Sequence, residues 1–340
     1  MKQPDGFVDK RFPHYVCKLT KALYGLKQAP RAWYDRLRST LLSWKFHHCK
    51  SDSSLFFYQD KTQILLVLIY VDDILVTGSN SSSIVQFTSK LNTLFALKDL
   101  GAVHYFLGFE ITRDPRGFIV SQSKYVTDLL SKYDMLNCSP CSTPMVTGRT
   151  LSLHDSAPND NPQQYRSIVG ALQNLVNSRP DISYSVSKLS QFLASPTILH
   201  WLAVKCLLRY LKGTLSYGIL LKPSLPLQLY AYSDADWASC PDDRRSTSGY
   251  FVFLGDSLVS WSSKKQLIVS RSSAESEYRG LSNTAAELTW VRSLLSELKF
   301  PLHSASVIWC DNLSAAALAS NPVLHARTKH IEIDAHYVRD

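Results

Sequence analysis

The sequence predicts a multidomain chain of mixed α+β and α/β type. Its 340 residues exceed the usual size of one compact domain and suggest two or three units. Runs of branched apolar residues, typical of strands, are interleaved with segments whose apolar residues recur at helical spacing. Residues 138–161 are rich in Pro, Ser, Thr, Asp and Asn, which indicates a linker between two such regions.

Composition narrows the class of protein. Lys and Arg number 37 against 28 Asp and Glu, and the formal charge of +9 favours an anionic partner, with nucleic acid as the first candidate. The seven cysteines are odd in number and no signal peptide is recognisable, which fits a reducing, intracellular compartment. Cys138 and Cys141 lack a second pair of ligands, which favours a loop over a zinc site. The apolar run 64–69 is too short for a membrane span, so no transmembrane segment is expected.

The first half of the chain is organised around residues 63–78. Two apolar runs of strand length flank the adjacent acids Asp72 and Asp73, which predicts a hairpin with both carboxylates at its tip. Two ionised acids on an apolar hairpin repel each other unless a cation lies beside them, and hard oxygen ligands suit Mg²⁺. A surface turn with two acids is the plainer alternative. The flanking strands and the basic chain favour the metal site.

Further elements surround this hairpin. A basic stretch with a Gly turn, residues 17–31, leads into a predicted helix over 31–44. The stretch is either a positively charged surface for phosphates or a solvated basic turn, and its residues leave both open. The pattern then predicts, in order, a helix over 81–97, strands over 105–111 and 117–120 with a turn at 114–117, and a helix over 122–135.

The second half changes pattern twice. Residues 165–210 show three apolar helix faces, with Lys212 and Gly213 as a helix stop, and carry no catalytic pattern. Beyond them we expect an α/β domain whose acids lie at strand ends, where open sheets build their sites. Its predicted elements are strands over 227–234, 249–254 and 258–262, a helix over 274–299, a strand over 306–312 and a helix over 314–320.

Three acids from separate elements of that domain form a second candidate site. Asp234 ends a strand, Glu277 lies in the first turn of the long helix, and Asp311 ends another strand. Three converging carboxylates are what two-metal hydrolysis of a phosphodiester requires. Each acid alone is more often a cap or a surface charge, and Asp311 is placed to cap the helix that follows it. Glu275 competes with Glu277, and Asp236 with Asp234; we favour Glu277 and Asp234.

Long motifs run in order through nearly the whole chain. Tyr70-Val71-Asp72-Asp73 lies between apolar strands and follows residues 23–33 (LYGLKQAPRAW). The others are residues 105–108 (YFLG), 165–172 (YRSIVGAL), 179–182 (RPDI), 208–214 (LRYLKGT), 232–238 (YSDADWA), 244–250 (RRSTSGY), 275–278 (ESEY) and 327–331 (RTKHI). In this combination the chain resembles the reverse transcriptase and RNase H region of copia-type LTR retrotransposon Pol polyproteins.

The resemblance implies a fold, partners and a location. It implies a partial polymerase palm and thumb over residues 1–145, a linker and helical connection over 146–225, and an RNase H-like α/β domain over 226–340. The implied partners are an RNA template, a DNA primer, an RNA–DNA hybrid and other products of the polyprotein. The implied location is a cytoplasmic retrotransposon particle.

The resemblance also implies roles for particular residues. Asp72 and Asp73 would hold Mg²⁺ for nucleotidyl transfer, and Asp234, Glu277 and Asp311 would hold it for cleavage of the RNA strand, with two ions at each site. The residues implied to lie near primer, template or nucleotide are Tyr70, Val71, Lys27, Gln28, Arg31, Leu107 and Gly108.

The family pattern includes two acids that the chain lacks. A third palm Asp belongs upstream of Met1, and a further RNase H acid belongs beyond Asp340, so the chain resembles a region truncated at both ends. Glu332 or Asp334 is the nearest substitute for the second of these acids. Loss of one ligand from a two-metal site removes charge and geometry together. The alternative to an active enzyme is therefore a catalytically impaired fragment that at most binds nucleic acid.

Overall fold

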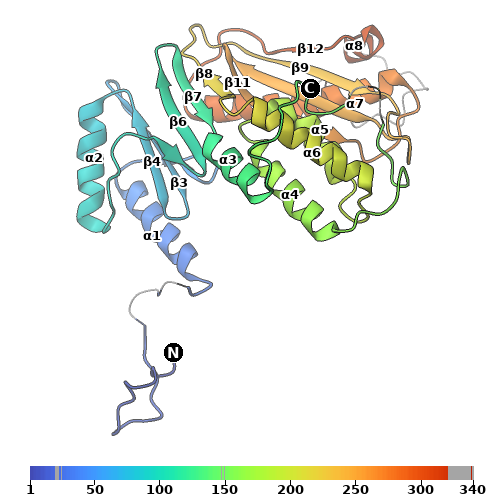
Figure 1. Ribbon diagram of the computed structural model, residues 1–340. Coiled ribbons are helices and arrows are strands. Elements are labelled where there is room, and N and C mark those ends of the chain that lie inside the picture. Colours follow the sequence, from blue (N-terminus) through green and yellow to red (C-terminus); the bar gives the residue numbers. More distant parts are fainter. Residues whose placement is uncertain (20–22, 24, 147, 149, 321–337, 339–340) are drawn as a thin grey trace. The chain divides into compact units, whose positions relative to one another are not determined.

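The computed structural model describes residues 1–19, 23, 25–146, 148, 150–320 and 338. The chain forms two compact units, residues 1–100 and residues 101–340 (Figure 1). The predicted mixture of helices and several sheets is confirmed. The motif at 327–331 and the substitute acids Glu332 and Asp334 lie outside the described residues.

The first unit packs two helices on a four-stranded antiparallel sheet. Its sheet has the strand order β1-β2-β3-β4. Alternate residues of β3 (Leu65, Val67 and Ile69) are buried against apolar side chains of both helices, because side chains of a strand alternate between its two faces. The elements are α1 (Ala29–Ser43), β1 (His47–His48), β2 (Leu55–Gln59), β3 (Ile64–Tyr70), β4 (Asp73–Gly78) and α2 (Ser81–Leu94).

The predicted helix over 81–97 is shorter in the structure. Asn80 caps the N-terminus of α2 by accepting a hydrogen bond from the Ser82 amide at 2.9 Å. The helix ends at Leu94 because Phe95 adopts an extended backbone, with φ −126° and ψ 129°, which turns its ring into the core of this unit.

The second unit begins with a sheet that joins distant parts of the chain. Strand β7 (Gly117–Ser121) pairs with β6 (Phe109–Asp114) and, on its other side, with β8 (Gly218–Leu221). The predicted strand over 105–111 is broken, because Leu107 and Gly108 have φ values of 50° and 88° and form a tight turn. The residues before that turn form a short separate strand, β5 (Tyr105–Phe106).

Helices between β7 and β8 share one apolar core. It contains Val126 and Leu130 of α3 together with Ile168, Leu172 and Leu208 of later helices. Packing is therefore continuous across residue 145, and a division of function at that residue stays a prediction. The helices are α3 (Ser123–Lys132), α4 (Pro162–Leu175), the 3₁₀ turn η1 (Pro180–Ile182), α5 (Ser183–Ser190) and α6 (Ile198–Gly213).

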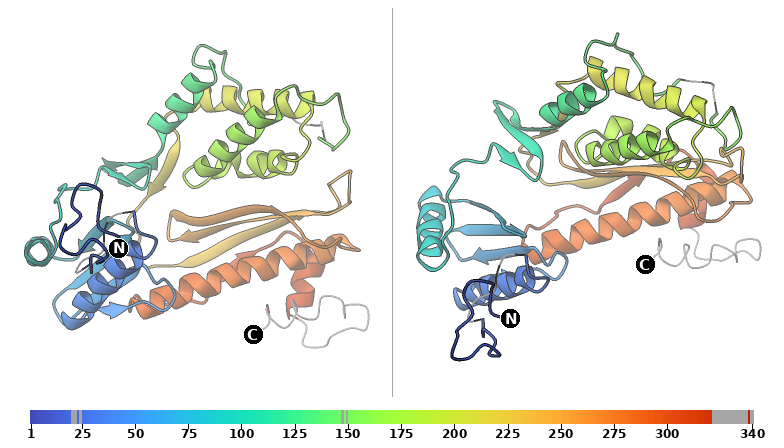
Figure 2. Two further views of the ribbon diagram at one scale, coloured as in Figure 1. Left: turned by 90° about the horizontal axis from the view of Figure 1, so that it is seen from below. Right: turned by 60° about the horizontal axis from the view of Figure 1, so that its bottom comes forward.

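A second sheet of this unit has the strand order β11-β10-β9-β12, with β12 parallel to β9. Its long helix α7 covers one face, and α4–α6 lie on the other side (Figure 2). The Trp261 indole of β11 donates a hydrogen bond to the Val176 carbonyl at 2.9 Å, which ties the sheet to the helices. The elements are β9 (Leu229–Asp236), β10 (Thr247–Leu254), β11 (Ser257–Lys265), α7 (Ser273–Glu297), β12 (Val307–Trp309) and α8 (Leu313–Ser320).

A buried arginine links the helices of this unit. Arg179 is 2% exposed; it pairs with Asp181 at 2.7 Å and donates to the Thr214 carbonyl at 3.1 Å. Burial acts to raise the pKa of Asp181, but the hydrogen bonds and charge of Arg179 outweigh it and hold that pKa below its ordinary value. The carboxylate therefore stays ionised and paired.

Arg179→Met is expected to lower the free energy of unfolding of the second unit by about 3 kcal/mol, because it leaves the Asp181 charge partly buried and unpaired. Arg116→Met is the matched control, since Arg116 pairs with Asp114 at 2.8 Å on the surface and its loss costs less than about 1 kcal/mol. Urea unfolding of the full chain measures both values, and equal losses would contradict the assigned role of Arg179.

Candidate active site

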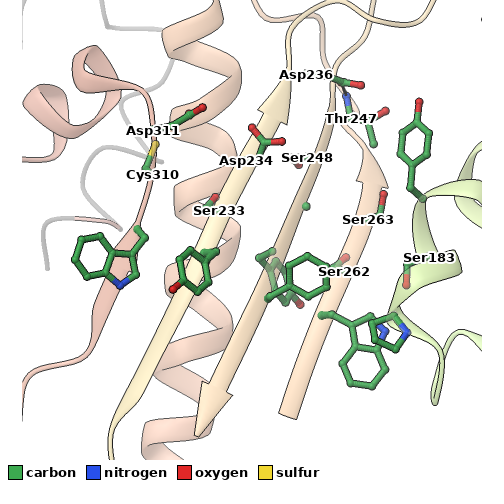
Figure 3. Close-up of a pocket in the computed structure, with 18 of the residues that line it drawn as sticks. Ser183, Ser233, Asp234, Asp236, Thr247, Ser248, Ser262, Ser263, Cys310 and Asp311 are labelled. Atoms are coloured by element: carbon green, nitrogen blue, oxygen red, sulfur yellow. Dashed lines mark hydrogen bonds between the residues drawn. The ribbon is translucent and has the colours of Figure 1, made fainter. Parts of the chain in front are cut away.

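The parallel pairing of β9 and β12 brings two acids to the same edge of the sheet. Trp309 lies opposite Tyr232 in the ladder, and Asp311 and Asp234 each follow two residues later. Figure 3 shows both carboxylates at the same end of these neighbouring strands. Along β9 the odd-numbered residues are buried, so Asp234 points away from the packed face.

Helix α7 supplies the third acid by packing closely against β9. Its N-terminus is fixed by Ser272, whose hydroxyl accepts a hydrogen bond from the Glu275 amide at 3.2 Å. Gly280 permits the close approach, since a Cβ there would lie 3.2 Å from the Ser233 Oγ. Glu277 lies three residues earlier, on the same face of the helix, and therefore points at the end of the sheet.

Glu277 is held in an unusual environment for a carboxyl group. It is 6% exposed, and its Oε2 has no hydrogen-bond partner among the described residues. Burial raises the pKa of Glu277 to about 7, and the charges of Asp234 and Asp311 add to this effect, while a backbone hydrogen bond from Ala235 opposes it. Near neutral pH this group therefore exchanges between its acid and its carboxylate.

Glu277→Gln is expected to stabilise the chain at alkaline pH in the presence of a chelator. Below pH 4.5, the ordinary pKa, Glu277 is protonated in both the folded and the unfolded chain, so its burial costs no charge. As the pH rises from there through about 7, the pKa of Glu277 in the folded chain, the free energy of unfolding falls. Glu277→Gln removes this loss, so its expected gain in the free energy of unfolding is at most about 3 kcal/mol at pH 8 and none at pH 4.

Unfolding of the wild type and of Glu277→Gln in EDTA at pH 4 and pH 8 measures this effect. Asp256→Asn, at an exposed turn, is the control and is expected to change the free energy of unfolding by less than about 0.5 kcal/mol. A Glu277→Gln effect that does not change with pH would contradict the buried, partly protonated state.

The structure distinguishes the alternative acids for this site, Glu275 from Glu277 and Asp236 from Asp234, by their hydrogen bonds and ion pairs. Glu275 is engaged by Arg279 at 2.9 Å and by the Arg271 amide at 2.8 Å. Asp236 accepts a hydrogen bond from the Thr247 amide. The N-terminal turn of α8 is capped by Asn312, which accepts from the Ala315 amide at 3.0 Å, so the cap is not Asp311. Glu277, Asp234 and Asp311 therefore remain as three acids at this end of the sheet, and Asp234 and Asp311 are close enough to Glu277 for their charges to raise its pKa.

Cys310 is a neighbour that the sequence reasoning did not identify. Among the described residues, Glu277, Cys310 and Asp311 form a group whose potential ligand atoms all lie within 4.8 Å of one another. Burial raises the pKa of the Cys310 thiol, and the surrounding carboxylates raise it further, so the thiol is protonated at neutral pH. Its position directly before Asp311, at the end of a strand, was the available signal.

The donor set fits a hard divalent cation. The carboxylates of Asp234, Glu277 and Asp311 are oxygen ligands of the kind that Mg²⁺ prefers, whereas a protonated thiol is a poor ligand for it. The Oε2 of Glu277, which has no partner within the part of the chain that the structure describes, is a buried acceptor that such a cation would satisfy.

A cavity of about 670 Å³ adjoins this site on the face of the sheet opposite α7, where Pro180, Ser183 and Tyr184 of η1 and α5 line its other side. Its wall carries the aromatic side chains of Tyr232, Phe251 and Trp309, which are 50%, 44% and 58% exposed. Asp234 and Asp311 lie at one end of the same cavity (Figure 3). Aromatic faces beside a carboxylate cluster offer stacking surfaces for nucleobases next to a place for a phosphate and its cation.

The predicted hairpin of the first unit is confirmed, with Asp72 at its tip. Strands β3 and β4 pair up to Tyr70 opposite Asp73, so Val71 and Asp72 form a two-residue turn. Val71 has φ 54°, a left-handed conformation that is rare for a β-branched residue. The Trp33 indole of α1 donates to the Val71 carbonyl at 3.0 Å and packs edge-on against Phe95, which holds the turn. Backbone strain of this kind is concentrated at functional sites.

The other predicted site residues are more dispersed. Lys27, Gln28 and Arg31 are exposed at the start of α1, where Arg31 lies 3.9 Å from Asp35. Tyr70 and Val71 are exposed at the hairpin tip. Leu107 and Gly108 belong to the second unit. Among the described residues, Asp72 and Asp73 join no group of three potential metal ligands.

Within the described parts of the chain, none of the helices combines the length and the apolar composition needed to cross a membrane.

Comparison with known proteins gives consistent matches. The family model for reverse transcriptase (RNA-dependent DNA polymerase) matches residues 1–147. A retrovirus-related Pol polyprotein from transposon RE2 of Arabidopsis thaliana is 51% identical over 340 residues, which is 100% of this chain and 23% of that protein. A protein assigned to transposon Ty5-1 of Saccharomyces cerevisiae is 35% identical over 85% of this chain and 94% of its own length.

Among solved structures, the foamy viral protease-reverse transcriptase in complex with dsDNA matches 94% of this chain and 58% of that chain, with 14% identity and a TM-score of 0.45. The chain spans about a quarter of the length of the polyprotein relatives it matches. Because its sequence is 35% to 51% identical to these transposon proteins and matches the reverse transcriptase family model, the chain belongs to the family of retrovirus-related Pol polyproteins of copia-type transposons.

Proposed function

We propose that the chain hydrolyses the RNA strand of an RNA–DNA hybrid at Asp234, Glu277 and Asp311. The observation that carries the proposal is the placement of three acids, from β9, α7 and the residues after β12, at one end of the sheet, together with a buried carboxyl oxygen of Glu277 that has no hydrogen-bond partner among the described residues. The strand order β11-β10-β9-β12, with α7 between β11 and β12 in the chain, supports an RNase H-like domain over residues 226–340.

The chain's own residues set up the chemistry. When bound, Mg²⁺ supplies an activated water and neutralises charge on the phosphodiester. The carboxylates of Asp234 and Asp311 would hold the cation, with the carboxyl group of Glu277 beside them, and Glu277 gains or loses a proton near neutral pH as the local charge changes. The exposed faces of Tyr232 and Trp309 orient the strand by stacking.

RNA-directed DNA synthesis is the second proposed activity, with Asp72 and Asp73 as ligands of Mg²⁺. It is favoured by the reverse transcriptase match over residues 1–147 and by the strained, anchored turn at Val71. In this proposal residues 1–145 are palm and thumb, and residues 146–225 are the linker and connection. RNA template, DNA primer and other products of the polyprotein are the proposed partners, in a cytoplasmic retrotransposon particle.

A cleavage assay on the full chain tests the first activity. The substrates are a labelled RNA–DNA hybrid, the same RNA alone and the corresponding DNA duplex, each with Mg²⁺ or with EDTA. The expected result is Mg²⁺-dependent cutting of RNA in the hybrid alone. Hybrid binding without cleavage would instead support the alternative, a catalytically impaired chain that at most binds nucleic acid.

A further inference from the structure

Two cysteines from distant parts of the second unit bring their sulfur atoms together. Cys141 lies in the segment between α3 and α4, and Cys206 lies in the middle of α6; their Sγ atoms are 3.7 Å apart and share a hydrogen bond. A disulfide has an S–S length of about 2.05 Å, so each sulfur has to move by only about 0.8 Å for the bond to form. Both side chains are half-buried, which leaves the pair open to a small reagent from the solvent.

Hydrogen bonds to α6 hold the Cys141 segment in place. The Cys141 amide donates to the Arg209 carbonyl at 3.3 Å, and the Arg209 Nε donates to the Ser139 carbonyl at 2.7 Å. Arg209 is three residues beyond Cys206 in the helix, so the two residues lie on the same face of α6. The cysteines are therefore kept adjacent by contacts that do not depend on a bond between their sulfurs.

The two thiols differ in acidity. A backbone hydrogen bond with Thr143 lowers the pKa of the Cys141 thiol below its ordinary value; burial opposes this effect, while the hydrogen bond with Cys206 and the charge of Arg209 add to it. Burial raises the pKa of the Cys206 thiol, and the hydrogen bond and charge of Cys141 raise it further. Cys141 is therefore the thiol that ionises first and attacks, and Cys206 is the thiol that reacts second.

We propose that Cys141 and Cys206 form a reversible dithiol that a small-molecule disulfide oxidises to an intramolecular disulfide bond. The Cys141 thiolate attacks one sulfur of the reagent, whose S–S bond breaks and releases the first small thiol. The Cys206 sulfur then attacks the Cys141 sulfur, the mixed disulfide breaks, and the second small thiol leaves. Both cysteines are oxidised, the reagent is reduced to two thiols, and the protons of the cysteines pass to those thiols.

The bond ties the segment after α3 to α6. It closes a loop that contains α4, η1 and α5, and a cross-link over a loop of this length restricts the unfolded chain and so stabilises the fold. Disulfides of proteins in reducing compartments are usually transient and redox-sensing, so the reduced pair is the resting state there. Neither cysteine belongs to the carboxylate site, and the inference therefore stands apart from both proposed activities.

Peptide mapping of the full chain tests the pairing. The wild type is treated with oxidised glutathione, its remaining thiols are blocked with iodoacetamide, and it is digested with trypsin without a reductant. Trypsin releases Cys206 in residues 206–209 and both Cys138 and Cys141 in residues 133–149, so the expected product is these two peptides joined, and dithiothreitol separates them. Peptides that stay apart, or that carry glutathione without joining, would overturn the proposal.

Cys138→Ser is the matched control for the pairing, because Cys138 lies in the same tryptic peptide as Cys141 and is also half-buried. Cys138→Ser is expected to give the joined peptides as the wild type does, whereas Cys141→Ser is expected to give none. Joined peptides in Cys141→Ser, or their loss in Cys138→Ser, would assign the bond to Cys138 and refute the pair.

The order of attack is tested by removing each thiol in the Cys138→Ser chain, where Cys138 cannot take part. Cys206→Ser is expected to stop at the mixed disulfide and to gain glutathione on Cys141. Cys141→Ser is expected to gain glutathione on Cys206 about tenfold more slowly. Equal rates for the two variants would contradict the assignment of Cys141 as the attacking thiol.

Thermal unfolding measures the effect of the bond on the fold. The oxidised wild type is expected to unfold at a Tm about 5 °C above that of the wild type reduced with dithiothreitol. The Cys138→Ser chain is expected to show the same rise, and Cys141→Ser and Cys206→Ser to show none. Joined peptides without a rise in Tm would refute the stabilising effect of the bond.

Discussion

Replacement of Asp234 by Asn is expected to lower the rate of RNA-strand cleavage in an RNA–DNA hybrid by about 1,000-fold or more. Asparagine keeps the size of the side chain and removes its charge. Asp234 shares the end of the sheet with Asp311 and contributes to the raised pKa of Glu277. Removing the charge therefore weakens the hold on a divalent cation and lowers the pKa of Glu277 toward its ordinary value.

Two further variants make this result specific. Asp256→Asn changes an exposed turn acid and is expected to cleave at the wild-type rate. Asp236→Asn alters the acceptor for the Thr247 amide and is expected to lose less than about tenfold in rate, since Asp236 is already hydrogen-bonded within the sheet. Asp234 would not be a ligand of the cation if Asp234→Asn kept a tenth of the wild-type cleavage rate, or if Asp236→Asn lost more of that rate than Asp234→Asn.

Hybrid binding must accompany the rate measurement. Asp234 lies near a polyanion, and its charge repels phosphates when no cation is bound. We therefore expect Asp234→Asn to bind the hybrid in EDTA at least as tightly as the wild type. A fall in binding in step with the fall in rate would indicate misfolding of this variant rather than loss of a ligand.

Local patterns in the sequence predicted much of the second sheet and its acids. The alternation along residues 227–234 predicted the strand that the structure shows as β9, and the predicted helix over 274–299 agrees with α7 to within two residues at each end. These signals depend on side-chain periodicity, which acts over a few residues. For that reason the sequence placed Asp234 and Asp311 near strand ends, although β9 continues two residues beyond Asp234 and β12 ends two residues before Asp311.

Long-range pairing was not predictable in the same way. Ser121 lies opposite Gly218 although 97 residues separate them, and no local pattern encodes that choice of partner. The choice between Glu275 and Glu277 depends on the close approach of α7 to β9 at Gly280 and on the engagement of Glu275 by Arg279. Both effects arise only once the helix is packed, since the two acids have the same chemistry and nearly the same place in the sequence.

In the hairpin of the first unit, too, the local features were predicted from the sequence and the long-range contacts were not. Alternating burial of Leu65, Val67 and Ile69 fixes the strands, so the acid pair at the tip was predicted. The strained backbone of Val71 was not predicted, nor was the hydrogen bond that its carbonyl accepts from the Trp33 indole, 38 residues away. A Val in a position that favours Gly is stable only when tertiary contacts hold it there.

Asp72→Asn is expected to abolish primer extension on an RNA template, with a loss of at least about 1,000-fold in nucleotide incorporation. Asp72 occupies the apex of the β3–β4 hairpin, and its backbone position is fixed by the bond between Trp33 and Val71. A carboxylate there is placed to hold a hard cation, which lowers the charge of an incoming triphosphate.

Asp35→Asn is the matched control, because Asp35 is exposed on α1 in the same unit and forms a long surface ion pair with Arg31 at 3.9 Å. It is expected to extend primers at the wild-type rate. Equal incorporation by Asp72→Asn and Asp35→Asn would remove the hairpin tip from the catalytic site. Absence of incorporation by the wild type, with hybrid binding intact, would favour the alternative in which the chain binds nucleic acid without polymerising it, and the strained turn at Val71 would then need another explanation.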